Sequence, residues 1–340
     1  MKKVKTNQND MAIDYLVIGT GNIALKHLTN ITNKSNNKII AVYKRFKNKL
    51  NNKFKIKGIK IISNIDNIIP KTNKAIAVIC SAASMHINDA ENVAKKGFNI
   101  LLEKPLTIPG IETKKLLKLC KNKKLKTLVG YNMRFMNRIK SLLNIIDNNN
   151  YGIIKEIEIS VETDFRKWRK NLNYKKTVSF SKNLGGGVIN ELSHEIDYLN
   201  LLFGKPKKVT VNNKINNSYS DIETHINATF EYAKKYPIIK MNLNMISSQI
   251  SRYCKIYYDN SLIKVDHIKN SISIKNDKQK MIKTYTDTLN DSYVKELNNL
   301  IKSIKKNISS ELSIEKCIST QNIINAMHKS IKSNKKELIS

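Results

Sequence analysis

A short apolar segment that runs directly into a glycine turn constrains the fold of this chain more than any other feature. Residues 15–18 (YLVI) have the pattern of a buried strand, and residues 19–24 (GTGNIA) follow at once and lead into an amphipathic stretch. A GxGxxA sequence between a strand and a helix is the arrangement that binds a dinucleotide pyrophosphate, because the glycines allow the tight turn and the close approach of the backbone. The N–H groups of a helix N-terminus favour anions. We therefore expect cofactor contacts from Gly19, Gly21, Asn22 and Ile23, with Ala24 allowing close helix packing.

The first third of the chain alternates short apolar runs with amphipathic stretches. This alternation is typical of βαβ units around a parallel sheet, whose strands are apolar throughout because helices cover both faces. The sequence predicts further strands at 39–43, 75–80, 99–102 and 127–130, and helices at 88–96, which Gly97 ends, and at 111–121. We interpret residues 1–132 as a Rossmann domain, a doubly wound parallel sheet of the α/β class.

The pattern changes after residue 132 and predicts a second domain, residues 133–340. Several segments alternate apolar and polar residues, as strands with one buried face do: 153–163, 208–215, 225–232, 238–246, 253–258 and 262–267. Two apolar stripes at helical spacing, within residues 294–304 and 314–331, predict closing helices, and we expect the tail after Lys332 to fray. The second domain is thus expected to be α/β with a largely antiparallel open sheet.

Charge and composition bear on the partners of the chain. The 340 residues include 61 Lys and Arg against 27 Asp and Glu, which gives a formal net charge of +34. The lysines run from Lys2 to Lys336 without a dense basic arm, so we interpret the charge as a solvated surface and expect no specific nucleic-acid partner. A nucleic-acid binder stays open as a rival reading, and its affinity would fall steeply with salt.

Membrane insertion, disulfides and zinc are not indicated by the sequence. The most apolar stretch, residues 75–83, is far shorter than the ~20 residues that span a bilayer, and the first residues hold no apolar signal core. We expect a cytoplasmic protein with no membrane partner. The four cysteines lie far apart without CxxC spacing, which predicts neither a disulfide framework nor a metal site.

Two basic residues at the end of the second predicted strand bear on the choice of cofactor. NAD-binding domains carry an Asp or Glu about 20 residues after the glycines, which binds the ribose 2′-hydroxyl. This chain has Lys44 and Arg45 there. A carboxylate repels a 2′-phosphate whereas a cation pairs with it, so we predict NADP(H), bound by Lys44 and Arg45, with NAD(H) as the alternative. Because lysine is abundant throughout the chain, the missing acid is the more informative observation.

Five segments combine into a wider pattern: GTGNIALKH (19–27), SAASMH (81–86), EKPLT (103–107), GYNMRF (130–135) and GGGVINELSHEID (185–197). In order and spacing they resemble the Gfo/Idh/MocA oxidoreductase family. The resemblance implies an N-terminal Rossmann domain, a C-terminal α/β domain with an open antiparallel sheet, and homodimers or homotetramers formed through that sheet.

The resemblance assigns a catalytic lysine to the EKP segment. The family's lysine carries over to Lys104, which stands at the end of the strand predicted at 99–102 and is expected to contact both cofactor and substrate. An ammonium group there polarises a carbonyl or stabilises a developing alkoxide. Pro105 is expected to hold a cis peptide bond. Glu103 either lies near the nicotinamide or supports the turn.

The triple-glycine segment supplies the expected proton carrier. His194 corresponds to the family histidine that moves the substrate's hydroxyl proton, a task that suits imidazole because it exchanges a proton near neutral pH. The family has Asp four residues before this histidine, where Asn190 stands here, and Glu191 lies three residues before it. Both spacings lie on one helical face, so we expect Glu191 to orient substrate or relay a proton and Asn190 to bind substrate. Asp197 is interpreted as a helix or interface residue. We expect His194 and Lys104 to converge on the same nicotinamide face.

Two further segments add expected contacts. SAASMH has two alanines where the family shows Pro and Asn, so we expect Ser81 to contact the cofactor through its backbone. His86 either packs in the interior or contacts the cofactor. Arg134 of GYNMRF is expected to bind substrate.

The segment before the glycines, RKWRKNLNYKK, resembles the DWRP-containing part of family members associated with surface-sugar and nonulosonate pathways, although lysines replace the Asp and the Pro. Trp168 is expected to stack on a sugar and Arg169 to pair with its carboxylate or phosphate, with Tyr174 also at the substrate. The alternative is a loop anchored by one buried aromatic residue.

Together these features predict an NAD(P)-dependent oxidoreductase that moves a hydride between nicotinamide and a CH–OH carbon of a sugar or sugar derivative. The alternative function is a dinucleotide-binding sensor or scaffold without turnover, which the displaced Asp position keeps open.

Overall fold

The computed structural model describes residues 11–33, 38–45, 51–148, 150–167, 173–214, 222–233 and 236–340. The chain forms two compact units. The first comprises Met1–Gly130 with Tyr293–Cys317, and the second comprises Tyr131–Ser292 with Ile318–Ser340. The boundary expected after residue 132 lies close to the first crossing between the units. The sequence pattern did not indicate that Tyr293–Cys317 groups with the first unit.

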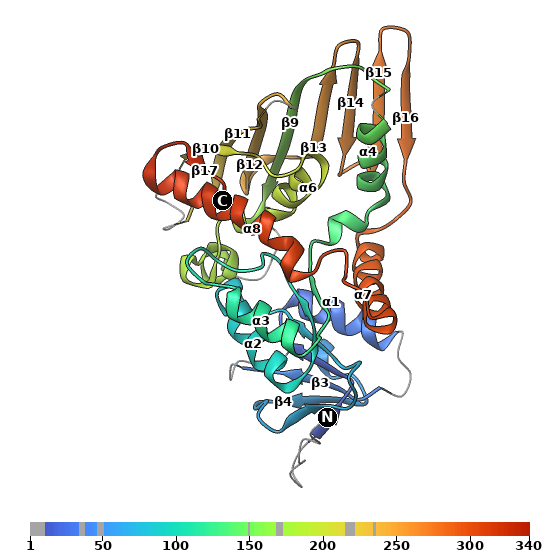
Figure 1. Cartoon of the computed structure of the whole chain (residues 1–340), viewed down its shortest axis with the longest axis vertical. Coiled ribbons are helices and arrows are strands. Elements are labelled where there is room, and N and C mark those ends of the chain that lie inside the picture. The colour runs from blue at the N-terminus through green and yellow to red at the C-terminus, as the bar shows by residue number, and fades with distance from the viewer. Residues whose placement is uncertain are drawn as a thin grey trace. The chain divides into compact units, whose positions relative to one another are not determined.

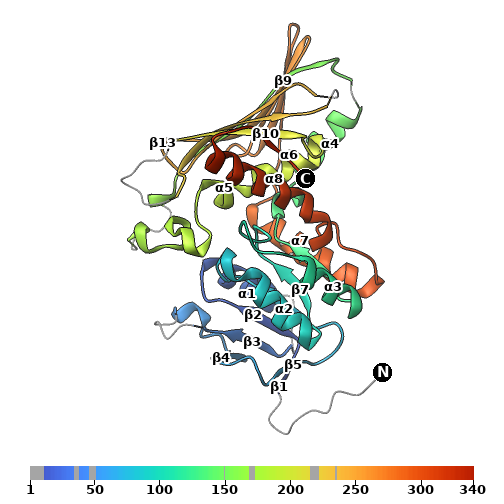
Figure 2. The same cartoon turned by 60° about the vertical axis from the view of Figure 1, so that its left-hand side comes forward.

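A six-stranded parallel sheet forms the centre of the first unit (Figures 1 and 2). Its strands are β2 (Tyr15–Ile18), β3 (Ile40–Tyr43), β4 (Ile59–Ile62), β6 (Ile76–Ile79), β7 (Asn99–Leu102) and β8 (Thr127–Val129). They lie in the order β4-β3-β2-β6-β7-β8, and every neighbouring pair is parallel. This is the doubly wound Rossmann order, which confirms the fold predicted for the first domain. A separate two-stranded sheet pairs β1 (Met11–Ile13) with β5 (Ile68–Pro70).

Helices cover both faces of the parallel sheet because its crossover connections are right-handed. The chain passes from β2 through α1 (Asn22–Thr32) to β3, and in the opposite direction from β6 through α2 (His86–Lys96) to β7. The two helices therefore lie on opposite faces, and α3 (Lys114–Asn122) packs beside α2. Helix α2 ends at Gly97 in the left-handed conformation, as predicted.

A nine-stranded sheet forms the second unit (Figure 1). Its strands are β9 (Ile154–Asp164), β10 (Lys208–Lys214), β11 (His225–Glu231), β12 (Ile239–Asn244), β13 (Ile246–Tyr258), β14 (Ser261–Asp266), β15 (Ser271–Asn276), β16 (Lys280–Thr284) and β17 (Glu337–Leu338). They lie in the order β16-β15-β14-β13-β9-β12-β11-β10-β17. Every pair is antiparallel except β9 with β12, so the prediction of a largely antiparallel open sheet is confirmed.

One face of this sheet holds the core of the second unit. Ile157, Ile159 and Val161 of the central strand β9 are buried there, because alternate residues of a strand point to the same face. They belong to one apolar cluster with residues of α4 (Asn137–Asn148), α6 (Ser193–Phe203) and the later part of α8 (Ile314–Ser333). The opposite face is polar, with ion pairs such as Lys255 to Glu158.

Some elements of the second unit differ from the sequence prediction. Helix α4 and strands β15 and β16 lie outside the predicted ranges, and β13 begins seven residues before the strand predicted at 253–258. The expectation of a frayed tail is wrong, because Glu337 and Leu338 pair with β10. The Glu337 carboxylate binds Lys329 Nζ at 2.6 Å and Ser333 Oγ at 2.7 Å, and both partners lie on α8. The remaining helix, α7 (Leu289–Lys306), agrees with the stripe predicted at 294–304.

Among the described residues, no helix is both long and apolar enough to cross a membrane. The thiols of Cys80, Cys120, Cys254 and Cys317 are all unbridged.

An ion pair at a buried carboxylate of the second unit gives a stability prediction. Glu195 on α6 is fully buried, and its two carboxylate oxygens accept from Nε at 2.7 Å and Nη2 at 3.1 Å of the partly exposed Arg252. Glu195→Gln removes the charge from this charge-assisted pair, so we expect a loss of about 2 kcal/mol in the free energy of unfolding. Denaturant titration measures it. Glu156→Gln, which removes the exposed pair with Lys240, is the matched control and should change stability little. Equal losses in the two variants would contradict the prediction.

Candidate functional site

The glycine turn lies at the carboxyl end of β2, where two strands of the parallel sheet bring their backbones together. Gly19 has φ +115°, and a Cβ there would lie 2.8 Å from the carbonyl oxygen of Cys80, at the end of the adjacent β6. No L side chain fits this position, so the residue type follows from the strand pairing. The turn occupies the edge at which the strand order reverses, which is where open α/β sheets bind ligands.

The start of α1 meets the requirements for a pyrophosphate. Gly21 is the N-cap of the helix, is exposed, and has no atom within 4 Å of the position a Cβ would take. Helix α1 has no side-chain cap hydrogen bond and no acidic residue in its first turn. Asn22 is exposed, Ile23 is partly exposed, and Ala24 is fully buried against the sheet side of the helix. These residues fit a dinucleotide phosphate bound at the N-terminal N–H groups.

The two basic residues after β3 differ in their surroundings. Arg45 Nη2 pairs with the buried carboxylate of Asp89 on α2, and Arg45 Nη1 contacts the Met85 sulfur at 2.7 Å. Ser81 Oγ donates to the second carboxylate oxygen of Asp89 at 2.7 Å. Asp89 therefore offsets much of the Arg45 charge, whereas the partly exposed Lys44 has its backbone N–H bonded to the Ile62 carbonyl. The sequence did not reveal this pairing, since Asp89 lies 44 residues from Arg45.

The EKP turn leaves the carboxyl end of β7, at the same edge of the sheet as the glycine turn. Glu103 is buried and its Oε2 accepts the backbone N–H of Lys104 at 3.2 Å. The peptide bond between Lys104 and Pro105 is cis, as predicted. The side chain of Lys104 is partly exposed. The catalytic role of this lysine stays a prediction.

His86 links two segments of the first unit. Its ring is buried, with Nδ1 2.8 Å from the Pro105 carbonyl oxygen and Nε2 3.1 Å from the Ser81 carbonyl oxygen. Of the two readings of His86, this geometry favours packing, because both ring nitrogens face carbonyl groups of the surrounding chain. A direct contact of His86 or Ser81 with a cofactor stays a prediction.

The triple-glycine segment of the second unit forms two short helices rather than one. Helix α5 (Val188–Glu191) ends at Glu191, Leu192 leaves the helical conformation with ψ 28°, and α6 begins at Ser193. The expectation that residues 190, 191 and 194 share one continuous helical face is therefore wrong in its geometry. His194 lies in the first turn of α6, is partly exposed, and has its ring edge-on to that of Tyr131 at 6.1 Å.

Asn190 and Glu191 occupy different environments. Asn190 is buried; its Nδ2 donates to the Gly185 carbonyl at 3.1 Å, and its Oδ1 lies 3.2 Å from His328 Nε2. Glu191 is partly exposed at the end of α5. The side chain of Glu191 is therefore the more accessible of the two, whereas the Asn190 amide links the glycine loop to α8 through its two hydrogen bonds. Substrate contacts of both residues stay predictions.

Of the remaining expected substrate residues, the structure describes Arg134 and Tyr174. Arg134 forms a two-point pair with Asp197, with Nε and Nη2 at 2.6 and 2.7 Å from the carboxylate, and Thr320 Oγ1 donates to the same carboxylate at 2.9 Å. Asp197 thus binds Arg134 and Thr320 within the second unit. Tyr174 packs edge-on against Phe180 at 5.1 Å. Trp168 and Arg169 lie outside the described residues.

Sequence analysis missed one acidic residue beside the glycine loop. Glu223 precedes β11, and its Oε1 accepts the backbone N–H of Ile189 on α5 at 3.3 Å. Gly187, with φ +108°, allows this approach, because a Cβ there would collide with the Glu223 carboxylate. Burial raises the pKa of Glu223 to about 7. No motif marks Glu223, since only the folded chain brings it to the glycines.

Comparison with known proteins covers both units. Residues 13–131 match a family model described as "Oxidoreductase family, NAD-binding Rossmann fold", and residues 145–338 match its partner, "Oxidoreductase family, C-terminal alpha/beta domain". Both models carry the designation GFO_IDH_MocA.

Individual relatives are distant. The chain is 26% identical over 248 residues to glucose-6-phosphate 3-dehydrogenase of Bacillus subtilis, covering 69% of this chain and 67% of that protein. It is 25% identical over 202 residues to inositol 2-dehydrogenase of Rhizobium meliloti, covering 59% and 58% of the two chains. The chain thus spans between about half and two thirds of the length of the curated relatives it matches first. A levoglucosan dehydrogenase solved in complex with NADH has the same fold, with a TM-score of 0.81 and 14% identity over 97% of this chain and all of that one.

The two glycines of the turn give a test of the cofactor site. Gly19→Ala introduces a strained left-handed alanine against the Cys80 carbonyl, so we expect both a lower melting temperature and loss of NAD(P)H binding. Gly21→Ala meets no protein atom, so it should melt like the wild type and bind the cofactor at least about tenfold more weakly, because the methyl group occupies phosphate space. Cofactor fluorescence titration and thermal melting measure both effects. Unchanged binding in Gly21→Ala would contradict the assignment.

Proposed function

The chain belongs to the Gfo/Idh/MocA family of oxidoreductases, and from that premise we propose that it transfers a hydride between a nicotinamide cofactor and a CH–OH carbon of a sugar or sugar derivative. Both domains of the family are matched, so the proposal concerns the chain from residue 13 to residue 338.

The observation that carries the proposal is the sharing of one sheet edge by two turns. The glycine turn follows β2 and the Glu103–Lys104 turn follows β7, and β6 lies between these strands in a parallel sheet. The carboxyl ends of parallel strands meet at one edge, so a dinucleotide held at Gly21 extends along the edge that presents Lys104. Bound there, the nicotinamide supplies the hydride acceptor in oxidation and the donor in reduction.

In the proposed chemistry, one residue accepts the proton of the substrate's hydroxyl group and another stabilises its oxygen. In oxidation His194 accepts the substrate's hydroxyl proton while the carbon loses its hydrogen as hydride, and the C–O bond becomes a carbonyl. Lys104 stabilises the negative charge that develops on that oxygen. Glu191 exchanges the proton between His194 and solvent. Reduction uses the same groups in the reverse order.

Recognition of the substrate is assigned to polar and aromatic residues of the second unit. We assign the hydroxyl groups of the sugar to Asn190, Arg134 and Tyr174, and an anionic substituent to Arg169 with Trp168 stacking on the ring. Relatives named for glucose 6-phosphate, inositol and levoglucosan support a polyhydroxylated ring as the substrate class. Surface-polysaccharide or nonulosonate biosynthesis is the pathway that the 166–176 segment favours.

The proposed cofactor is NADP(H). Its 2′-phosphate is assigned first to Lys44, because Arg45 already pairs with Asp89, which offsets part of the guanidinium charge. Arg45 would present the flat face of its guanidinium group to the ribose. NAD(H) is the alternative, which the Arg45 to Asp89 pair favours.

The proposed assembly is a homodimer or homotetramer formed through the polar face of the nine-stranded sheet. Cross-strand contacts such as Tyr253 to Glu158 at 2.7 Å order that face. We propose a cytoplasmic location.

A sensor without turnover is the second candidate. The observation that favours it is Asn190, whose buried amide bonds to Gly185 and His328 and cannot carry a proton where the family has Asp. Cofactor binding without reaction of any sugar would support it.

Turnover variants test the proposed chemistry. With NADPH or NADH and a panel of keto-sugars, Lys104→Met and His194→Asn should each lower kcat about 100-fold or more, because each removes a group used in the transition state. Cofactor affinity should stay within about threefold. Lys118→Met on an exposed part of α3 and His225→Asn on β11 are matched controls expected to keep full activity. Full activity in both site variants would refute the mechanism.

Charge removal at the end of β3 tests the cofactor. Lys44→Ala should weaken NADPH about tenfold or more and NADH by less than about threefold, because only NADPH carries the 2′-phosphate. Arg45→Ala should have a smaller effect on that ratio, since Asp89 shares its charge. Tighter binding of NADH than NADPH by the wild type would show that the NADP(H) assignment is wrong.

A further inference from the structure

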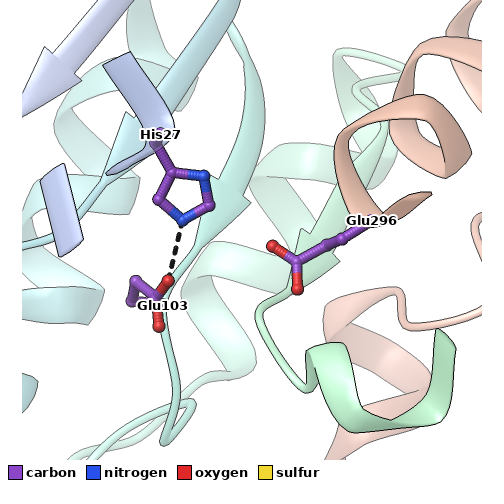
Figure 3. A group of neighbouring side chains, drawn as sticks. All are labelled: His27, Glu103 and Glu296. Atoms are coloured by element: carbon purple, nitrogen blue, oxygen red, sulfur yellow. Dashed lines mark hydrogen bonds and ion pairs between the residues drawn. The ribbon is translucent and has the colours of Figure 1, made fainter. Parts of the chain in front are cut away.

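Three ionisable side chains meet in the interior of the first unit (Figure 3). His27 comes from α1, Glu103 from the end of β7 and Glu296 from α7, and all three are buried. One nitrogen or oxygen atom of each lies within 4.8 Å of the others. The cluster stands beside the proposed active-site turn, because Glu103 directly precedes Lys104.

Glu103 is held from several sides. Its Oε1 pairs with His27 Nε2 at 2.8 Å, and its Oε2 accepts the backbone N–H of Lys104 at 3.2 Å. Gly130, at the end of β8, packs against this side chain, and a Cβ there would lie 3.2 Å from Oε2. The Glu103 carboxyl group therefore links the first peptide of the turn to α1.

Glu296 is in a different situation. It is fully buried, and neither carboxylate oxygen has a hydrogen-bond partner among the described residues. Figure 3 shows its carboxyl group directed toward Glu103. Burial, and then the charge of Glu103, raises the pKa of Glu296 well above its usual value.

The groups around Glu296 supply little positive charge. From β7 it faces the Glu103 carboxylate, from α1 the His27 ring, and from the end of β6 the Cys80 thiol, whose pKa is raised by burial and then by Glu103 and Glu296. On the helix that carries Glu296, the ring of Tyr293 packs edge-on against that of His27, with 5.4 Å between the ring centroids. Lys26 Nζ, from α1, lies 4.9 Å from the centroid of the Tyr293 ring. His27 is already paired with Glu103, so a second carboxylate charge is poorly compensated.

We propose that Glu296 is a positioning residue that stays uncharged, so that Glu103 alone carries the negative charge of the cluster and keeps the Lys104 turn fixed to α1. This role rests on the proposed function of Lys104. Ionisation of Glu296 at high pH places two carboxylates side by side, and their repulsion loosens the Glu103 to His27 pair and the turn behind it.

A bound divalent cation is the competing explanation, because imidazole and two carboxylates form a donor set that zinc or manganese accepts. A cation requires both carboxylates to be ionised, whereas the proposal requires one to be protonated. Glu296→Gln imitates the protonated acid and cannot replace an ionised ligand, so the two explanations give opposite results.

Thermal melting of the full chain between pH 4 and pH 9 is the first measurement. Since the pKa of Glu296 is higher in the folded than in the unfolded chain, the folded state binds the extra proton, and wild-type stability falls as pH rises from the ordinary value of 4.5 toward the raised one. Glu296→Gln lacks this loss. We expect it to melt as the wild type at pH 4 and about 3 °C or more above it at pH 7 and higher. A lower melting temperature at pH 7, or a difference that does not change with pH, would overturn the proposal.

Two variants complete the test. Glu195→Gln, at a carboxylate whose oxygens are both paired, is the matched control and should melt below the wild type at pH 7. Glu296→Met also removes the charge and should fold; failure of both Glu296→Gln and Glu296→Met to fold at pH 7 would overturn the proposal. The proposal would also be overturned if added zinc or manganese raised the melting temperature of the wild type but not that of Glu296→Gln.

Turnover as a function of pH separates this proposal from the proposed function. The kcat of Glu296→Gln at neutral pH should stay within about threefold of the wild-type value. At alkaline pH its kcat should fall less than that of the wild type, because the ionisation of Glu296 no longer contributes to the fall. An alkaline decline identical to the wild type's would overturn the positioning role. If Lys104→Met leaves turnover unchanged while the melting results come out as expected, the proposed function fails and the protonated state of Glu296 stands.

Discussion

The approach of the glycine turn to the neighbouring strand at the carboxyl edge of the parallel sheet is the constraint on which the first unit depends. Gly19 lies so close to the Cys80 carbonyl that only a residue without a side chain fits. The two strands that meet there, β2 and β6, are those between which the sheet order reverses, so their following segments diverge to opposite faces and leave a crevice. The Glu103–Lys104 turn leaves β7 at that same edge, which is why strand order alone relates the glycine turn to the proposed catalytic lysine.

Arginine and lysine have different uses in this chain. Among the described residues, four arginines pair with buried carboxylates: Arg45 with Asp89, Arg134 with Asp197, Arg166 with Asp164 and Arg252 with Glu195. A planar guanidinium satisfies two carboxylate oxygens at once and is more weakly hydrated than an ammonium group, so arginine is the cation that a buried acid retains. Lysines also pair with buried acids, Lys38 and Lys71 with Asp14 and Lys329 with Glu337, but these lysine side chains are themselves largely exposed. Because the chain has 61 basic residues, its net charge does not indicate which lysine or arginine side chains contact a substrate. The ion-pair partner of each side chain is the more informative observation.

Two carboxyl groups have raised pKa values for related reasons. Glu223 beside the glycine loop accepts hydrogen bonds from its own backbone N–H and that of Ile189, and Glu296 beside Glu103 accepts none among the described residues. Burial disfavours the charged form of both and raises their pKa values, and at Glu296 the charge of Glu103 adds to that effect. Each stands next to a segment that carries a proposed catalytic residue, the helices that hold Glu191 and His194 in one case and the Lys104 turn in the other. Carboxyl groups with raised pKa values thus lie beside both segments that carry proposed catalytic residues.

The sequence by itself determined the local elements and the residues that backbone geometry demands. The strand at 15–18, the Gly19 turn, the Gly97 helix stop, the cis Lys104–Pro105 bond and the two sheet types all follow from short segments, because period, glycine and proline act over a few residues. Only the tertiary structure decided which ionisable groups lie next to one another. Asp89 and Arg45, Asp197 and Arg134, and Glu296 with Glu103 lie far apart in the chain, and no local pattern relates them. The break at Leu192, which separates Glu191 from His194, likewise came from packing around the glycine loop and not from propensity. Burial and pairing are properties of contacts between distant segments, and these set the charge on each candidate residue.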